Sequence, residues 1–344
     1  MKSRTYFMSI LMVLILCCMS LAGCNNKTKK IDQKEIETSN ADVTEACTPD
    51  SDADSKGNEE ADDASSEFES GEEELKETIS WEQIKEIKPT EKSIKNRFAG
   101  FFNENLGIAT YQYGRVFYTN DGGETWTAGK NTSNCIAGLD IIDEKNAFMT
   151  ANYSEVRISN DGGVNWTRVP EFGDMKNEHC RFVSFIDSNT GWIANKKELG
   201  FTKDAGQTWE SIAVPQSLSE ICAIWLSSTT EGYILSVDAI LYATTDGGKT
   251  WAEKDLGLKG LMVLVCPTVA IHFDDQQNFQ MVAYLNDDTD KGFYYLSTVD
   301  GGDSWAKKEL ILEEGPGYTY FNRDSSLLTI SDKTSTIHVY RFVE

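Results

Sequence analysis

From residue 79 onward, short hydrophobic runs alternate with polar turns, and the same four-part order returns about every 40 residues. Runs of four to seven residues that are rich in Val, Ile, Phe and Tyr and bounded by turn residues predict β-strands rather than helices. Each unit has three such runs before a Ser/Thr–x–Asp turn and a fourth run after it. The first three strands of each unit are predicted at residues 98–102, 108–111 and 115–118; 139–142, 147–151 and 155–158; 182–186, 191–194 and 198–201; 223–226, 232–236 and 239–243; and 270–273, 280–284 and 292–296.

The turn after each third strand is written five times, at residues 119–126, 159–166, 202–209, 244–251 and 298–305. Each copy has Ser or Thr first, Asp third, Gly or Ala fourth, Gly fifth, a small polar residue seventh and Trp eighth. Glycine reaches positive φ without a steric clash, and the Asp carboxylate can accept hydrogen bonds from the same turn. We interpret these residues as structural rather than catalytic: Asp121, Gly123, Trp126, Asp161, Gly163, Trp166, Asp204, Gly206, Trp209, Asp246, Gly248, Trp251, Asp300, Gly302 and Trp305.

These five turns resemble the Asp-box, or BNR, repeat, which occurs in sialidases, sortilin-type receptors and the photosystem II assembly and stability factors. The resemblance covers about residues 79–344, and the order of strands within each unit is most similar to that of the photosystem II factors. It implies a β-propeller and, for that family, an assembly scaffold that binds partners without catalysis. The arginine-rich binding patch of that family has no counterpart here, because the seven arginines of this region are scattered.

The spacing of the turns predicts the number of blades. Successive box Asp residues are 40, 43, 42 and 54 residues apart, which fits one four-stranded propeller blade per repeat. After the last box, strands are predicted at 318–321, 326–330 and 336–342, and no sixth box follows. Residues 79–86 resemble the strand after a box, so we expect them to complete the last blade, with Trp81 as the sixth Trp. The sequence therefore predicts six blades, or seven if residues 256–266 add strands.

The N-terminus predicts export. Lys2 and Arg4 precede an apolar run at residues 8–20, which is short for a membrane span. The following Leu-Ala-Gly-Cys, residues 21–24, is similar to a bacterial lipobox, so we expect residues 1–23 to be a lipoprotein signal peptide and Cys24 to be lipidated. An ordinary cleaved signal peptide and an uncleaved anchor are the alternatives. Each of these interpretations places most of the chain outside the cytoplasm, and the first anchors it to the cell membrane.

Residues 24–78 predict a disordered acidic tether. Between residues 25 and 78 there are 18 Asp and Glu against six Lys, and Phe68 is the one aromatic residue. Such a segment cannot bury enough apolar surface to offset its ordering entropy. Together with the net charge of −23 for the whole chain, it makes nucleic acid an unfavourable partner. The predicted domains are thus the signal peptide at 1–23, the tether at 24–78 and the propeller at 79–344.

No catalytic pattern emerges from the sequence. The three histidines stand in unrelated contexts, and there is no nucleophile elbow or phosphate-binding loop. The Phe/Tyr-Arg-Ile-Pro motif of the sialidases is absent. We therefore predict a monomeric, non-catalytic cell-surface lipoprotein that needs no cofactor and acts as a binding or assembly scaffold. The alternative is a carbohydrate-binding or sialidase-like glycoside hydrolase propeller, which would place two carboxylates opposite each other in the central depression.

The ligand is expected on the face that carries the inter-blade loops and the loops between second and third strands. An acidic folded part favours a cationic protein or peptide partner, or a metal. In the loop at residues 286–292, Asp288 and Asp290 are a weak metal candidate, because the Glu of a calcium loop is missing. The candidate contacts are Tyr111, Tyr113, Tyr153, Asp287, Asp288 and Asp290. The disulfide state of Cys135, Cys180, Cys222 and Cys266 stays open, with buried thiols as the simplest expectation.

Overall fold

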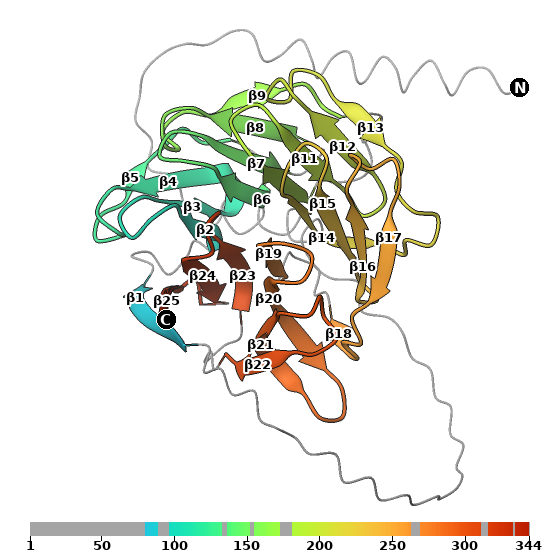
Figure 1. Ribbon diagram of the computed structural model, residues 1–344. Coiled ribbons are helices and arrows are strands. Elements are labelled where there is room, and N and C mark those ends of the chain that lie inside the picture. Colours follow the sequence, from blue (N-terminus) through green and yellow to red (C-terminus); the bar gives the residue numbers. More distant parts are fainter. Residues whose placement is uncertain are drawn as a thin grey trace, which may run out of the picture. The chain divides into compact units, whose positions relative to one another are not determined.

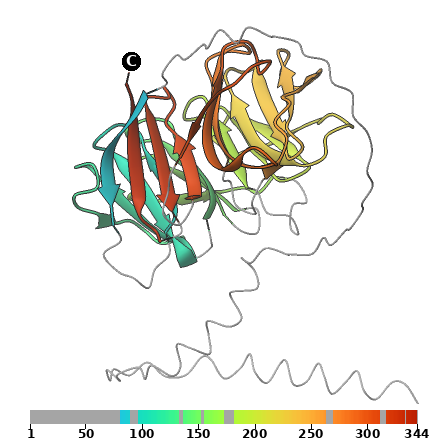
Figure 2. The same ribbon diagram turned by 90° about the horizontal axis from the view of Figure 1, so that it is seen from below.

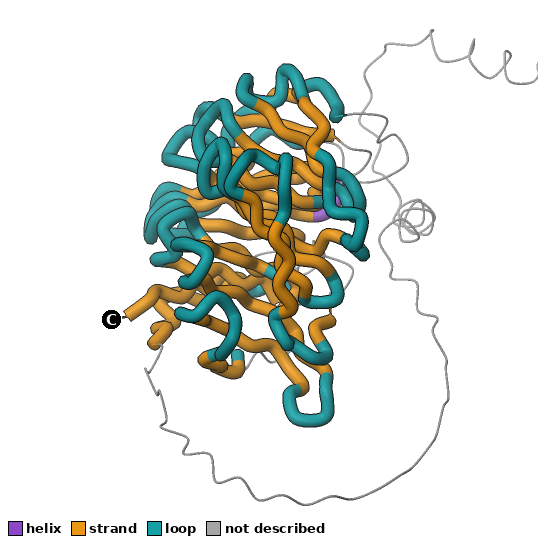
Figure 3. The backbone as a smooth tube through the Cα atoms, turned by 45° about the vertical axis from the view of Figure 1, so that its right-hand side comes forward, coloured by secondary structure: helices purple, strands orange, loops and turns teal. Residues whose placement is uncertain are grey.

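The computed structural model describes residues 80–88, 96–132, 136–151, 155–172, 181–262, 269–310, 316–332 and 334–343. Its strands form six antiparallel sheets that stand around a common axis (Figure 1). Strands and turns make up nearly all of the described chain, with one short helix, η2 (Gln112–Gly114), among the residues described (Figure 3). The predicted all-β, six-bladed propeller is confirmed. Within these ranges, no helix is long and apolar enough to span a membrane.

The first four blades follow the chain, each with its strands in order from the axis outward. Blade 1 contains β2 (Asn96–Phe101), β3 (Gly107–Tyr111), β4 (Arg115–Thr119) and β5 (Thr127–Ala128). Blade 2 contains β6 (Ile136–Ile141), β7 (Ala147–Ala151), β8 (Glu155–Ser159) and β9 (Thr167–Val169). Blade 3 contains β10 (Phe182–Phe185), β11 (Gly191–Ala194), β12 (Leu199–Thr202) and β13 (Glu210–Ile212). Blade 4 contains β14 (Ile221–Leu226), β15 (Gly232–Ser236), β16 (Ile240–Thr244) and β17 (Ala252–Asp255).

The last two blades depart from this regular order. Blade 5 contains β19 (Ala270–Phe273), β20 (Phe279–Asn286), β21 (Lys291–Thr298), β22 (Ala306–Glu309) and the additional short strand β18 (Leu261–Met262), which pairs with the far end of β20. The described part of residues 256–266 therefore adds one short strand, β18, to blade 5, and the described strands form six sheets. Blade 6 contains β23 (Pro316–Phe321), β24 (Leu327–Asp332), β25 (Ile337–Val343) and β1 (Ser80–Ile87).

Blade 6 takes its outer strand from the N-terminal side of the chain, as predicted. Strand β1 pairs antiparallel with β25, from Ser80 opposite Val343 to Ile87 opposite Ile337. Figure 2 shows β1 in cyan beside the red C-terminal strands. The Trp81 ring is buried between blades 5 and 6, with its centre 5.5 Å from that of Tyr295. The pairing covers an edge of β25 that would otherwise expose unpaired N–H and C=O groups.

Contacts between neighbouring innermost strands run around the whole axis. In order, β2 contacts β6, β6 contacts β10, β10 contacts β14, β14 contacts β19, β19 contacts β23, and β23 contacts β2. Between blades, the aromatic ring at the end of one innermost strand stacks on the second strand of the preceding blade. Phe148 stacks on Phe185 with centres 3.5 Å apart, and Tyr233 stacks on Phe273 at 3.8 Å. The core thus consists of six hydrophobic clusters that lie between neighbouring blades around the ring.

The box turns lie on the same face as the loops between first and second strands. The fourth residue of each box donates its backbone N–H to a carbonyl of that loop in its own blade, at distances of 2.8–2.9 Å. The pairs are Gly122 with Asn105, Gly162 with Lys145, Ala205 with Asn189, Gly247 with Thr230, and Gly301 with Gln277. We call this side the Asp-box face. The opposite face carries the inter-blade connections and the loops between second and third strands.

The fifth residue of each box packs without a side chain. Gly123 has φ +87°, and a Cβ there would lie 2.4 Å from Ile87 of β1, in the preceding blade. Gly248 meets Ile212 of blade 3 in the same way, at 2.3 Å. Three box Trp residues connect neighbouring blades, because Trp209, Trp251 and Trp305 donate their indole N–H groups to carbonyls that follow the outer strand of the preceding blade. The five turns therefore act between blades as well as within them.

Candidate functional site

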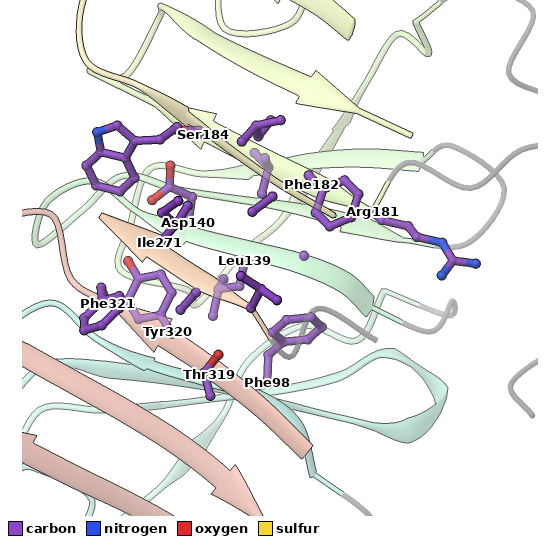
Figure 4. Close-up of a pocket in the computed structure, with 17 residues that line it drawn as sticks. Phe98, Leu139, Asp140, Arg181, Phe182, Ser184, Ile271, Thr319, Tyr320 and Phe321 are labelled. Atoms are coloured by element: carbon purple, nitrogen blue, oxygen red, sulfur yellow. The ribbon is translucent and has the colours of Figure 1, made fainter. Parts of the chain in front are cut away.

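One position in the innermost strand is special in every blade. It is the residue before the last of the strand, and we call the six residues at this position the collar: Gly100, Asp140, Ser184, Trp225, His272 and Tyr320. All six are buried. Because equivalent residues of propeller blades point the same way, the collar surrounds the axis at the Asp-box end of the innermost strands. Figure 4 shows Asp140, Ser184 and Tyr320 converging there.

Three collar side chains accept hydrogen bonds from the backbone of other blades. Asp140 Oδ2 accepts from the N–H of Phe185 at 2.7 Å, and Ser184 Oγ accepts from the N–H of Leu226 at 3.0 Å. The Tyr320 hydroxyl accepts from the N–H of Ile141 at 2.9 Å. Each bond satisfies a backbone donor at the end of an innermost strand, so the collar holds the central strands in fixed positions.

Arg323 contacts the collar from the loop between the first and second strands of blade 6, at a position that only stabilises the loop in the other blades. In blades 1 to 5 the corresponding residue accepts hydrogen bonds from its own loop; these residues are Asn103, Asp143, Asp187, Ser228 and Asp275. The Arg323 guanidinium instead lies 4.5 Å from the centre of the Trp225 ring, and its Nη2 donates to the Leu226 carbonyl at 3.3 Å. Arg323 therefore crosses from blade 6 to blade 4 at the Asp-box end of the innermost strands.

Burial shifts the pKa values of two collar residues, Asp140 and His272. It raises the pKa of Asp140, against the opposing effect of the Arg323 charge and of the hydrogen bond from Phe185. It lowers the pKa of His272, whose Nε2 lies 3.2 Å from Asp274 Oδ1. Among the described residues, His272 Nδ1 and Arg323 Nη1 are buried without a hydrogen-bond partner. Asp140 Oδ1 accepts no hydrogen bond in the described part of the chain.

A cavity of about 90 Å³ extends along the axis from the collar. Most of its wall is apolar, and it includes Phe98, Leu139, Phe182 and Ile271. Of the described residues that line it, Asp140 supplies the one carboxylate. Since roughly 10–15 Å³ of such space holds one water molecule, the cavity has room for several waters or for one slender side chain. Arg181 lines the end away from the collar, as Figure 4 shows.

The predicted ligand-face residues lie apart from this cavity. Tyr111 ends β3 and packs edge-on against Phe117, and burial raises its pKa. Tyr113 follows in η2 with φ +63° and a 51% exposed side chain. Tyr153 lies outside the described residues. The three aspartates lie in blade 5, which blade 6 separates from blade 1 in the ring, so the structure does not bring the two groups together.

Two aspartates of the blade 5 loop, Asp287 and Asp290, form hydrogen bonds or an ion pair within blade 5. Asp287 Oδ1 accepts from the backbone N–H groups of Thr289 and Asp290, and these bonds lower its pKa. Asp290 Oδ2 is paired with Lys307 Nζ at 2.6 Å, while Asp288 is exposed. No group of three or more His, Cys, Asp or Glu residues suited to a metal ion occurs within the described ranges.

Every box Asp is held by the same network. Asp121 Oδ1 accepts from the Thr125 N–H and the Thr119 hydroxyl, and Oδ2 accepts from the Thr125 hydroxyl. These bonds, with that from the Thr125 hydroxyl the strongest, lower the pKa of Asp121 to about 2. Asp161, Asp204, Asp246 and Asp300 make the equivalent bonds. Both carboxylate oxygens are thereby engaged within the turn.

Other predicted residues fall partly outside the described chain. Cys24 and the predicted signal peptide and tether lie there, as do Cys135, Cys180 and Cys266. Cys222 is a buried free thiol that donates to the Ser236 carbonyl, and burial raises its pKa. The indole nitrogen of Trp81 is buried without a hydrogen-bond partner among the described residues, whereas four box tryptophans donate to a carbonyl: Trp166, Trp209, Trp251 and Trp305.

One family model matches the chain: the BNR/Asp-box repeat, at residues 117–128. No curated protein matches. The fold is similar to several solved propellers. A structure of YCF48 with a bound D1 peptide superposes with a TM-score of 0.52 at 12% identity, covering 77% of this chain and 97% of that one.

Two further solved structures of similar fold come from other proteins. The first is a catalytically inactive virginiamycin B lyase from Staphylococcus aureus with quinupristin, with a TM-score of 0.52 at 10% identity, covering 77% of this chain and all of that one. The second is a chain of the mitotic checkpoint complex, with a TM-score of 0.53 at 10% identity, covering 85% of this chain and all of that one. At these identities the likeness establishes the shared propeller fold.

Proposed function

We propose that this protein is a non-catalytic extracytoplasmic scaffold that binds a segment of a protein partner at the centre of its propeller. The observation that carries the proposal is the central channel, which is narrow, mainly apolar and lined at one end by collar residues. Rigid strands fix this channel from six sides, so binding there would cost little ordering of the protein. The YCF48 structure, in which a propeller holds a D1 peptide, supports peptide recognition by this fold.

The chemistry of the channel favours binding over hydrolysis. Glycoside hydrolases of the two-carboxylate type hold their acid and nucleophile or base about 5–10 Å apart across the substrate. The described lining of this channel has one carboxylate, that of Asp140, and one of its oxygens is bound to the Phe185 N–H. A cavity of about 90 Å³ is also small for a sugar ring with its catalytic water. Sialidase-like hydrolysis is therefore the less favoured function.

The strand order shows on which face the propeller begins, and the N-terminal sequence supports a membrane anchor. Strand β1 begins at Ser80 beside Val343, and the N–H of Phe342 donates to the Ser326 carbonyl in a loop of the Asp-box face. The described chain thus enters the propeller on the Asp-box face. We infer that Cys24 is lipidated and holds the protein at the membrane. Replacing Cys24 by Ser should move the protein from the membrane fraction to the soluble fraction.

The function is tested by cross-linking in the native membrane. The full-length tagged protein is cross-linked in its own cells, purified, and analysed by mass spectrometry and by release of reducing sugar. A reproducible protein partner without sugar release is expected. If no protein is recovered while a glycan is bound or cleaved, the scaffold proposal is wrong and the hydrolase alternative takes its place.

A further inference from the structure

The collar end of the channel contains a buried carboxylate, that of Asp140, which is not needed to hold the strands together. Ser184 shows that a neutral hydroxyl is sufficient to accept the N–H of the next blade. At the equivalent position of blade 2 there is a carboxylate instead, only 6% exposed and therefore costly to bury. Asp140 lines the cavity. Its Oδ2 accepts a hydrogen bond from the Phe185 N–H, and its Oδ1 accepts none among the described residues.

We propose that the channel receives the side chain of a lysine from the partner, with Asp140 as the counter-ion of its ammonium group. This proposal rests on the proposed function and names the chemistry that the partner must present. An ammonium has three donors and needs acceptors around it. Asp140, Ser184 and Tyr320 line the same cavity from three different blades and offer a carboxylate and two hydroxyl oxygens.

The dimensions and the walls fit a lysine. On β10 and just before it, the lining runs from Arg181 to Ser184, and three residue steps of an extended strand span about 10 Å. The extended side chain of lysine measures roughly 6 Å from Cα to its nitrogen. Its apolar stem would lie against Phe98, Leu139 and Phe182, so only the charged end needs a polar partner.

The channel should select lysine over arginine. A guanidinium binds a carboxylate best through both oxygens, and Asp140 has only one oxygen to offer, because the other is bound to Phe185. An ammonium is a compact point charge that is satisfied by one carboxylate oxygen and neighbouring hydroxyls. The lysine must enter from the face opposite the Asp boxes, because Arg323 lies over Trp225 at the other end.

The test uses three capped peptides, Gly-Gly-Lys-Gly-Gly and its counterparts with norleucine or arginine in the middle, titrated calorimetrically into the full-length protein. We expect the lysine peptide to bind about tenfold more tightly than the other two, as for a charge-assisted hydrogen bond. Asp140→Asn should remove this preference. The variant keeps an oxygen for the Phe185 N–H, so its thermal unfolding should stay close to that of the wild type.

The control is Asp143→Asn, which removes the same charge three residues away at an outer loop position. Asn103 fills that position in blade 1 and accepts the same kind of loop hydrogen bonds, so this variant should keep the lysine preference. Equal affinities of the wild type for the lysine and norleucine peptides would overturn the proposal, and this result does not depend on how the variant folds. A lysine preference that remains in Asp140→Asn would also overturn it.

The same variant separates this proposal from the scaffold function. In the native-membrane cross-linking, a partner captured equally by the wild type and by Asp140→Asn would leave the scaffold function standing and refute the lysine channel. A lysine preference in the titration with no partner in the membrane would refute the scaffold function and keep the channel as an amine-binding site.

Discussion

The ring of Tyr320 fills the space in which a side chain at Gly100 would stand. A Cβ at Gly100 would lie 2.8 Å from Tyr320 Cδ1, and Tyr320 extends past this point to bond with the backbone of Ile141 in blade 2. The absence of a side chain in blade 1 thus lets blade 6 reach blade 2. The two residues occupy the same position in adjacent blades, and they are complementary in size.

Replacing Gly100 by Ala should destabilise the propeller by about 1–3 kcal/mol, because the added methyl group forces the Tyr320 ring from its place. Chemical denaturation of the full-length protein would measure the change. In a Tyr320→Leu background the same substitution should cost clearly less, because the two side chains interact directly. Equal costs in both backgrounds would show that Tyr320 is not the source of the strain.

The box carboxylates should make stability fall in acid. Hydrogen bonds from the hydroxyls and N–H groups of the turn lower the pKa of Asp121 and of Asp246 to about 2, against about 3.9 for an unfolded chain. The stabilisation is therefore fully present above about pH 4 and is lost as the pH falls through about 2. The free energy of unfolding, measured by denaturant titration between pH 5 and pH 2, should decrease over this window.

Asp246→Asn provides the matched variant for this effect. Its amide can keep an acceptor in the turn but does not titrate, so the stability difference from the wild type should shrink as the pH falls toward 2. A difference that stays constant from pH 5 to pH 2 would show that Asp246 gains no stability from its ionised form.

The closing strand depends on Trp81. The ring is buried and lies within 6.2 Å, centre to centre, of Tyr295, Phe321 and Phe342. Trp81→Ala should cost about 3–5 kcal/mol in the free energy of unfolding, as for other buried aromatic side chains, and should speed proteolysis near β1. Gln83→Ala, at an exposed site of the same strand, should change stability by less than about 0.5 kcal/mol. Similar effects of the two variants would contradict the closing role of Trp81.

Arg323 and Asp140 should be energetically coupled. Arg323→Met removes the cation over Trp225 and the hydrogen bond to Leu226, and it leaves Asp140 without the positive charge that counteracts its burial. A loss of about 1–2 kcal/mol is expected. In an Asp140→Asn background the loss should be about 0.5–1 kcal/mol smaller, as a double-mutant cycle would show. Strict additivity would mean that the two charges do not interact.

Most of the fold could be predicted from the sequence because it is written in repeats. The box fixes where the third strand ends and the fourth begins, and the missing sixth box together with Trp81 indicates the closing strand. The sequence left open whether residues 256–266 add strands, and in the described part of this range β18 (Leu261–Met262) adds to blade 5. Its two residues carry no periodic pattern of their own, and their pairing with Tyr284 and Leu285 depends on tertiary contacts.

The candidate site was harder to predict. The sequence predicted contacts in exposed aromatic and acidic loops, such as Tyr113 and Asp288, whereas the collar is buried. A signal was nevertheless present, since aligning the repeats places Asp140, His272 and Tyr320 at one position and sets Arg323 where the other blades have Asn, Asp or Ser. That these side chains meet around one axis follows from the closed ring, which no single repeat specifies.

Photo-cross-linking can show directly which face of the propeller binds the partner. A photo-reactive benzoylphenylalanine can be placed at Tyr113, which is 51% exposed on the face opposite the Asp boxes, or at Val299, which is 70% exposed in a box turn. After illumination of intact cells, denaturing electrophoresis would detect covalent adducts. We expect a partner adduct from position 113 and none from position 299. An adduct from position 299 alone would contradict binding on the face opposite the Asp boxes.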